Sequence, residues 1–396
     1  MIRLRLFRRK ESTAAPRTTN RSGEIPVFLA SHHYFTKSHF YLQLTKKCMI
    51  KRKNLYFEEL KIVASDRGLY WAGLGKKKIL ITGASGMIGS YIVDLLMMRN
   101  HLFDDSIEVF ALSRNMDKLA KKFLCYQDKD SLHIIEQDIC NTLMLETDVD
   151  YIIHAASNTH PLEYAKKSVE TITTNVVGLN NIYEYARNKP GCRVVVLSSV
   201  EIYGENRGDV DGFDESYCGY IDCNTLRAGY PESKRLCETM AQAYNNQYGI
   251  DSVIVRLSRI YGPGVEDDDS KAMTQFINKA INHEDIVLKS DGSQLYSYTY
   301  IADAVRAILK VMLEGKSGQA YNVADDTSDK TLKDIAEFLA SISGSKVIYE
   351  IPNESESRGY STVTKAVLAA KKIKRLGWKP LFSMEEGLRQ TLNIMD

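Results

Sequence analysis

The sequence has no apolar run near the roughly 18 residues that a membrane-spanning helix requires. Its seven cysteines form no CxxC pair and no Cys/His spacing typical of a zinc site. It also has no internal repeat and no low-complexity tract. We therefore expect free thiols, no metal and no membrane partner, as in a cytoplasmic globular protein.

Charge is distributed unevenly along the chain, although the net charge is only +2. The first 53 residues hold 13 Lys and Arg against two acids, Glu11 and Glu24, so this segment carries +11 and the remainder −9. A nucleic-acid-binding protein normally carries its basic surface on the folded body. The acidic body therefore argues against a nucleic-acid partner.

The basic N-terminal segment leaves three interpretations open. It is rich in Arg, Ser and Thr and poor in acids, as transit peptides are, but it lacks the apolar core of a secretory signal. A second interpretation is that the natural start is Met49 and that residues 1–48 are dispensable, and a third is a genuine appendage. We expect residues 1–73 to form a basic extension that is partly disordered or dispensable, and a protein starting at Met49 to fold.

Strand and helix patterns alternate from residue 74 onwards. Short apolar strands are expected at 77–82, 107–112, 132–136, 151–154, 193–197 and 252–257, and helices at 90–98, 114–123, 163–187 and 231–248. Such alternation predicts an α/β domain over residues 74–258, with a parallel sheet covered on both faces. Residues 252–257 are expected to be its last strong strand.

The pattern changes in residues 259–396. Turn signals occur at 262–264 and 291–292, and helices are expected at 270–281, 301–313 and 331–341. We interpret this region as a smaller domain, interleaved with the first, that closes over the edge of the sheet.

A glycine-rich loop joins the first strand to the first helix. Its three glycines, Gly83, Gly86 and Gly89, have the spacing GxxGxxG rather than GxGxxG. In a strand–loop–helix unit they permit a tight turn, a close approach to a pyrophosphate and packing of helix on strand. The helix N-terminus adds free N–H groups and a partial positive charge. The loop therefore predicts a dinucleotide site on a doubly wound Rossmann sheet.

The end of the second strand leaves the choice between NAD and NADP open. A carboxylate there would accept a hydrogen bond from the 2′-hydroxyl of NAD, but this chain has Ser113 followed by Arg114. Arg114 can meet a 2′-phosphate, or it is a solvated residue at a helix start. Asp138, after the third strand, can receive the adenine amino group.

Tyr230 and Lys234 form a YxxxK pair at the start of an expected helix. The i,i+4 spacing places both side chains on one face. A tyrosine has an ordinary pKa of about 10, and a neighbouring ammonium group favours its phenolate form. The pattern also arises by chance in a chain with 23 tyrosines. Ser199, just past a strand, can hydrogen-bond a reacting hydroxyl beside Tyr230.

Together these motifs resemble the extended short-chain dehydrogenase/reductase superfamily, which includes nucleotide-sugar epimerases, dehydratases and decarboxylases. The resemblance covers residues 77–394 in order, through TGASGMIG, DI, HAAS, TNVVG, SSVEIYG, YPESK, RIYGPG and YNVAD. It implies a Rossmann domain with a smaller C-terminal α/β substrate domain, a nucleotide-sugar substrate and a homodimer. It also implies a catalytic group of Ser199, Tyr230 and Lys234, with Asn175 as a fourth polar residue near cofactor and substrate. Further implied cofactor contacts are Ser85, Met87, Ile88, Ile139, Ala155 and Ala156.

Within that superfamily the chain most resembles UDP-glucuronate decarboxylases, through HAASNTHPLEYAKKSVETITTNVVG and DESYCGYIDCNTLRAGYPESKR. It departs from them at two positions expected to contact the substrate. Tyr296 stands where these enzymes usually have an arginine thought to meet the sugar carboxylate. Arg259 stands where they have an asparagine. A uronic-acid substrate therefore does not follow from the resemblance.

The leading hypothesis is an NAD(P)-dependent enzyme that transiently oxidises a nucleotide sugar, with Tyr230 as the base. Dehydratases and decarboxylases of the superfamily commonly carry a glutamate at the position of Glu201. Glu201 therefore predicts chemistry at or beside C5 of a 4-keto sugar, unless it is a structural acid. If the strand stays extended, Glu201 and Ser199 face the same site. The alternatives are a simple 4-epimerase and a catalytically silent dinucleotide-binding protein.

Overall fold

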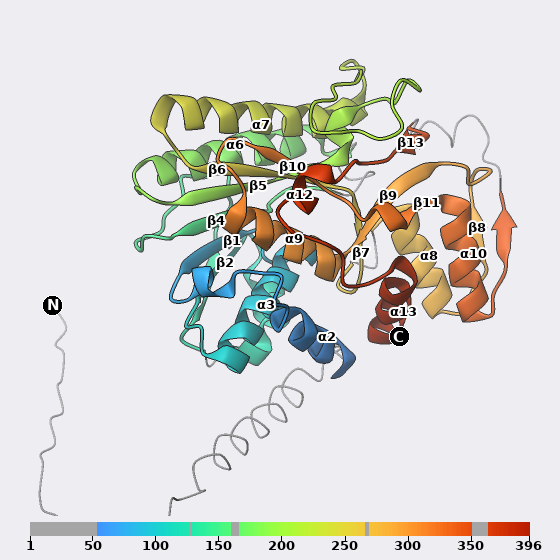
Figure 1. The fold of residues 1–396 in the computed structure, drawn as a ribbon, viewed down its shortest axis with the longest axis horizontal. Coiled ribbons are helices and arrows are strands. Elements are labelled where there is room, and N and C mark those ends of the chain that lie inside the picture. The colour runs from blue at the N-terminus through green and yellow to red at the C-terminus, as the bar shows by residue number, and fades with distance from the viewer. Residues whose placement is uncertain (1–53, 127–128, 160–165, 266–268, 351–362) are drawn as a thin grey trace, which may run out of the picture. The chain divides into compact units, whose positions relative to one another are not determined.

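The computed structural model describes residues 54–126, 129–159, 166–265, 269–350 and 363–396. Its largest element is a seven-stranded, entirely parallel sheet in the order β10-β6-β5-β4-β1-β2-β3 (Figure 1). The strands are β1 (Lys78–Thr82), β2 (Glu108–Ser113), β3 (Leu132–Glu136), β4 (Tyr151–His154), β5 (Arg193–Ser199), β6 (Ser252–Leu257) and β10 (Ala320–Val323). The order reverses between β1 and β4, which is the topological switch point where doubly wound sheets bind ligands. The Rossmann class predicted from the sequence is confirmed.

Helices cover both faces of this sheet, because its strands are apolar on both sides. On one face α6 (Ser168–Arg187) packs against α7 (Gly229–Tyr248), and on the other α3 (Met87–Phe103) packs against α9 (Ile301–Glu314) (Figure 1). The short helix α4 (Met116–Lys122) lies beside β2 and β3. Residues 163–165 of the predicted helix 163–187 lie outside the described residues.

Residues 252–257, expected to be the last strong strand of the first domain, are followed in the same sheet by one more short strand. Residues 301–323 form α9 and β10, and β10 joins the large sheet by pairing in parallel with β6. A four-residue strand at the edge of a sheet gives little periodic signal, so its position depends on the packing of α9. The large sheet therefore takes its seventh strand from the region expected to form the smaller domain.

The remaining C-terminal residues form small sheets that the sequence did not predict. β9 (Leu295–Tyr300) pairs with β7 (Arg259–Tyr261), β11 (Asp329–Thr331) and β13 (Lys365–Ala366), and β8 (Ile286–Leu288) pairs with β12 (Val347–Tyr349). The predicted helices 270–281 and 331–341 correspond to α8 (Ala272–Ile281) and α10 (Leu332–Ser343). The helices α12 (Lys371–Lys374) and α13 (Met384–Met395) complete the region.

Residues 54–74, assigned from sequence mostly to the extension, pack on the folded body. The helix α2 (Asn54–Ala64) contacts α3, α9 and α13, and the 3₁₀ turn η1 (Trp71–Leu74) follows it. Phe57, Leu60 and Val63 of α2 are at most 1% exposed. Three buried apolar side chains make this helix part of the core, whatever the role of the residues before it.

None of the helices in the described ranges is long and apolar enough to cross a membrane. The six cysteines within those ranges are free; Cys125, Cys192 and Cys237 are buried, whereas Cys218 and Cys223 are exposed.

Candidate active site

The glycine loop has a backbone geometry that only glycine allows at two of its three positions. Gly83 has a φ of 65°, and a Cβ there would lie 2.7 Å from the carbonyl oxygen of Ala155. A Cβ on Gly89 would lie 2.4 Å from the carbonyl oxygen of Gly83, so this glycine lets α3 pack closely on β1. A Cβ on Gly86 would have only the Gly83 carbonyl oxygen nearby, at 3.3 Å, and Gly86 lines a cavity. The loop therefore fits the backbone approach of a pyrophosphate.

The cavity beside this loop has a volume of about 1450 Å³. Cavities for a single small ligand are usually ~300–1,000 Å³, so this one has room for a dinucleotide and a second ligand. It runs from the glycine loop past the ends of β5 and β6 to β8 and β9. Every cofactor residue predicted from the sequence except Asn175 lines it: Gly83, Ser85, Gly86, Met87, Ile88, Gly89, Arg114, Asp138, Ile139, Ala155, Ala156, Tyr230 and Lys234.

Asn175 is placed differently from the expectation. It is fully buried on α6, and its Nδ2 donates to the Ser233 hydroxyl oxygen at 2.8 Å, while its Oδ1 has no hydrogen-bond partner among the described residues. Ser233 lies between Tyr230 and Lys234 on α7. Asn175 therefore contacts the helix that carries the YxxxK pair rather than the cavity itself.

Ser199, Tyr230 and Lys234 all line the cavity. Ser199 ends β5, and the other two side chains come from the first turns of α7. The Lys234 ammonium donates to the Leu197 carbonyl oxygen at 2.9 Å and lies 5.9 Å from the centre of the Tyr230 ring. The i,i+4 spacing thus places both groups on one helix face, as the sequence predicts.

Burial lowers the pKa values of two basic side chains in this part of the structure, Lys234 and His154. Burial lowers the pKa of Lys234, and the nearby Cys237 and Glu238 oppose that shift. Burial, assisted by the positive charge of Lys234, also lowers the pKa of His154 to about 3. Near neutral pH His154 is therefore uncharged, and its Nδ1 lies 3.0 Å from the Thr82 hydroxyl oxygen.

Glu201 reaches the cavity by a route that the sequence did not predict. The strand does not stay extended: β5 ends at Ser199, and residues Val200–Tyr203 form the 3₁₀ turn η3. The Ser199 hydroxyl oxygen caps this turn by accepting from the Glu201 backbone N–H at 3.2 Å. Both Ser199 and Glu201 nevertheless line the cavity.

Arg259 and Tyr296, the two positions that depart from the decarboxylase pattern, lie in contact. Arg259 pairs with Tyr298 across β7 and β9, and the diagonal neighbour Tyr296 is on the same face of the sheet. The Arg259 guanidinium lies 3.8 Å from the centre of the Tyr296 ring, and its Nη2 is 3.7 Å from Glu201 Oε1. The Tyr296 hydroxyl donates to the Val363 carbonyl oxygen at 2.6 Å. A cation therefore lies over Tyr296, beside a carboxylate.

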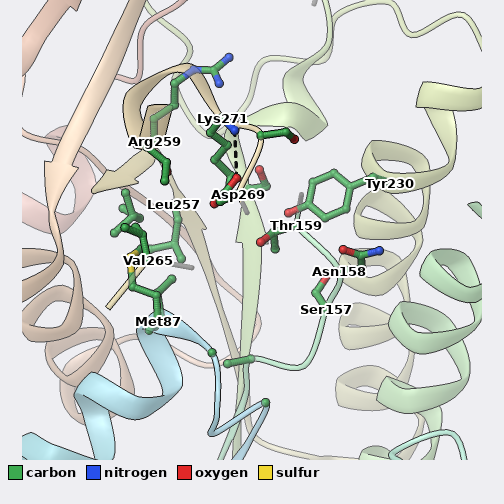
Figure 2. A pocket seen from close by; sticks show the side chains of 18 of the residues that line it. Met87, Ser157, Asn158, Thr159, Tyr230, Leu257, Arg259, Val265, Asp269 and Lys271 are labelled. Atoms are coloured by element: carbon green, nitrogen blue, oxygen red, sulfur yellow. Dashed lines mark hydrogen bonds and ion pairs between the residues drawn. The ribbon is translucent and has the colours of Figure 1, made fainter. Parts of the chain in front are cut away.

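Sequence reasoning missed several polar residues that line the cavity. Figure 2 shows Tyr230 and Thr159 pointing toward one another from α7 and from the segment after β4, with Asn158 nearby. Across the cavity, on the side of Arg259, the Lys271 ammonium lies 3.0 Å from Asp269 (Figure 2). Asn158 and Thr159 belong to the HAASNTHPLEY stretch that carried the resemblance, but they were given no role. Asp269 and Lys271 lie in a loop without a motif, so only their position before α8 could have drawn attention to them.

A partly buried polar network supports the strand that ends at Ser199. The Ser198 hydroxyl donates to Glu238 at 2.5 Å, and Arg256 donates to the same carboxylate at 2.7 Å. Arg256 also donates to the Tyr203 hydroxyl oxygen at 2.8 Å, and Tyr203 donates to Asn322 on β10 at 2.6 Å. The network links β5, the turn that carries Glu201, α7 and β10.

No group of three or more His, Cys, Asp or Glu side chains suited to a metal ion occurs within the described residues. The cavity brings together the glycine loop at the N-terminus of α3, the Tyr230–Lys234 pair, and a polar region that contains Glu201 and Arg259. These are the parts of a dinucleotide-dependent enzyme built on a Rossmann sheet.

Comparison with known proteins agrees with that class. Residues 79–324 match the model of the NAD dependent epimerase/dehydratase family. The chain belongs to this family, whose members include enzymes that act on nucleotide sugars.

Among characterised relatives, UDP-glucuronic acid decarboxylase 5 of Arabidopsis thaliana is 30% identical over 315 residues, which cover 78% of this chain and 87% of the relative. UDP-glucuronic acid decarboxylase 1 of Danio rerio is 28% identical, with 80% of this chain and 72% of the relative covered.

Solved structures share the fold. A dTDP-glucose 4,6-dehydratase of Streptomyces venezuelae with NAD bound has a TM-score of 0.68 and 26% identity, covering 80% of this chain and 96% of that one. The UDP-glucose 4-epimerase of Thermotoga maritima also has a TM-score of 0.68, with 23% identity, and covers 80% of this chain and 98% of that one. Decarboxylases, dehydratases and epimerases all occur among these similar proteins.

Proposed function

We propose that this protein oxidises a nucleotide-activated sugar at C4 and then carries out chemistry at or beside C5, as a decarboxylase or a dehydratase does. The observation that carries the proposal is the position of Glu201 in the same cavity as the glycine loop, Ser199 and Tyr230. A plain 4-epimerase needs no carboxylate at that place, because only the hydride returns to the other face of the sugar. A silent dinucleotide-binding protein needs neither Tyr230 nor Lys234.

Tyr230 is the proposed base for the sugar 4-hydroxyl. The bound nicotinamide supplies the chemistry of hydride acceptance and return. Ser199 holds the reacting oxygen by a hydrogen bond, while Lys234, fixed by the Leu197 carbonyl, places positive charge near the phenol. Asn175 positions the same helix through Ser233 rather than by contact with a ligand.

Glu201 is the proposed partner of the second step. In an elimination of water, the 4-keto group acidifies the C5–H, and a carboxylate beside it can accept that proton. In a decarboxylation the C5–C6 bond breaks instead and the 4-keto group holds the electron pair as an enolate, so the acid form of Glu201 would return a proton to C5. The ion pair with Arg259 orients the carboxylate, since Arg259 is itself held over the Tyr296 ring. Arg259 and Tyr296 are therefore the proposed substrate contacts at this end of the cavity.

The Arg259 contact also bears on the kind of sugar. The sequence lacks the arginine of the decarboxylases at position 296, but the structure brings a guanidinium over that position from the neighbouring strand. A guanidinium can form a bidentate pair with a carboxylate. This favours a uronic acid over a neutral hexose as the substrate.

A homodimer is the proposed assembly. The helices α6 and α7 pack on one another and still expose apolar side chains: Val169, Ile172 and Val177 on α6 and Leu236 and Tyr248 on α7. Apolar side chains grouped on two neighbouring helices fit an isologous interface. Light scattering during gel filtration should give twice the mass of the chain, and Val169→Glu should shift it toward the monomer.

The test of the reaction uses heavy water and NMR. Purified protein is incubated in D₂O with NAD⁺ or NADP⁺ and with UDP-glucuronate, UDP-glucose or dTDP-glucose, and the products are examined for deuterium at C5 and for loss of carbon dioxide or water. We expect one of these sugars to be converted by the wild type, and Glu201→Gln to block conversion after oxidation. Glu205→Gln, an exposed acid outside the cavity, is the matched control. Inversion at C4 without deuterium at C5 or loss of either molecule would show a plain epimerase.

A further inference from the structure

The adenosine end of the cavity lacks the carboxylate that usually selects NAD. In doubly wound folds this acid follows the second strand and accepts from the ribose 2′-hydroxyl. Here β2 ends at Ser113, whose hydroxyl oxygen lies 2.9 Å from that of Ser85 in the glycine loop. Two hydroxyl groups of the protein therefore meet where an acid would stand, and both residues line the cavity.

Positive side chains gather around this hydroxyl pair. Arg114, which directly follows Ser113, and Lys118 on α4 both line the cavity. Lys122, one turn after Lys118 on α4, donates to the Ser85 carbonyl oxygen at 3.0 Å. Of the four cationic side chains in the nine residues that follow β2, two line the cavity and a third, Lys122, contacts the glycine loop.

One acidic side chain lines the cavity at this end, against the two cationic side chains of Arg114 and Lys118. Asp138 lines the cavity, and its Oδ1 accepts from the Cys140 backbone N–H at 2.9 Å. Glu136, which pairs with Ser113 across β2 and β3, accepts from the Met116 backbone N–H at 3.2 Å and lies outside the lining, as does the exposed Asp117.

The position of Arg114 is supported by its effect on a neighbour. Burial raises the pKa of Cys140, Asp138 raises it further, and the charge of Arg114 opposes the shift. The Arg114 guanidinium therefore lies within electrostatic reach of Cys140, next to Asp138 in the cavity lining.

We propose that Ser85, Ser113, Arg114 and Lys118 form a subsite for the 2′-phosphate of NADP, so that this protein binds NADP(H) at least as tightly as NAD(H). An arginine and a lysine supply charge-assisted donors to phosphate, and the paired hydroxyls supply neutral ones. The inference rests on the proposed function only in requiring that the glycine loop holds a dinucleotide. It does not depend on which sugar is converted.

The test is calorimetric titration of the protein with NADP⁺ and with NAD⁺, without any sugar. We expect Arg114→Ala to weaken NADP⁺ binding by roughly ten- to hundredfold and NAD⁺ binding by no more than about threefold, because only NADP⁺ carries the extra phosphate. Lys118→Ala should act in the same direction. Lys121→Ala, which removes the same charge from an exposed position of α4 outside the cavity, should leave both affinities unchanged.

A second variant tests the place of the missing acid. Ser113→Asp should reverse the preference in favour of NAD⁺, because it restores the acceptor for a 2′-hydroxyl and repels a 2′-phosphate. Wild-type protein that prefers NAD⁺, or equal losses for both dinucleotides in Arg114→Ala, would overturn the subsite. Protein that binds neither dinucleotide would overturn the proposed function as well. Conversion of a sugar with NAD⁺ as the preferred dinucleotide would overturn the subsite alone.

Discussion

Glu59 on α2 is a buried carboxyl group whose titration should govern part of the pH dependence of stability. It is 1% exposed, and it accepts hydrogen bonds from the Tyr91 hydroxyl at 2.8 Å and the Tyr300 hydroxyl at 2.6 Å. Burial raises its pKa from 4.5 to about 7, although the hydrogen bonds from both tyrosines oppose the rise. Between these two values the folded protein keeps a proton that the unfolded chain releases.

The free energy of unfolding should therefore fall as the pH rises through this window, because the folded state then binds more protons than the unfolded state. For a single site with pKa values of 4.5 and about 7, the destabilisation at pH 8 exceeds that at pH 5 by about 2 to 3 kcal/mol. Burial also raises the pKa of Asp303 and of Asp329 to about 6, so the protein as a whole should show the same trend.

The Glu59→Gln variant isolates the contribution of this one group. The amide keeps the size of the side chain and a hydrogen-bond acceptor but does not titrate. The free energy of unfolding is measured in urea at pH 5, 6, 7 and 8. The value for Glu59→Gln minus the value for wild type should rise by about 2 to 3 kcal/mol from pH 5 to pH 8. Glu58→Gln, on the exposed side of α2 where Glu58 pairs with Lys61, should show no such gain. A difference between Glu59→Gln and wild type that stays constant with pH would refute the reasoning.

Three further substitutions test the site and the fold. Tyr230→Phe should lower turnover by at least the ~10²–10⁴-fold typical of general-base loss, with dinucleotide affinity nearly unchanged by calorimetry; wild-type turnover would remove Tyr230 from the mechanism. Gly89→Ala should weaken dinucleotide binding by roughly tenfold or more, because its Cβ would lie 2.4 Å from the Gly83 carbonyl oxygen and must shift the loop; unchanged affinity in calorimetry would contradict this. Leu60→Ala should lower the free energy of unfolding by ~2–5 kcal/mol in urea, because Leu60 is 0% exposed in α2. A loss below about 0.5 kcal/mol, typical of surface substitutions, would show that α2 is dispensable.

Local sequence pattern was sufficient to predict those parts of the fold and site whose geometry is set by residues close together in the chain. The six strands predicted for residues 77–257 are present, since each is a short apolar run between helices. The glycine loop lies between β1 and α3, and the YxxxK pair lies on one face of α7. In each case the geometry follows from the spacing along a single strand or helix.

Features that depend on distant segments were not predictable. β10 is too short to signal a strand, and it completes the sheet only because α9 packs against α3. Glu201 follows a strand, but the cap by Ser199 turns the chain into a 3₁₀ turn. Asn175 contacts Ser233 rather than the cavity, because helix packing sets the direction of its side chain.

The sequence by itself determined the class of this protein: an α/β chain with a dinucleotide loop and a tyrosine–lysine pair, because these are properties of local periodicity and spacing. Only the tertiary structure decided the chemistry around them. Arg259 and Tyr296 are 37 positions apart, and the pairing of β7 with β9 stacks one on the other beside Glu201. The burial of Glu59, and with it the rise in its pKa, depends on the packing of α2 against Tyr91 and Tyr300. Contacts of this kind depend on how strands and helices pack, which no single stretch of sequence encodes.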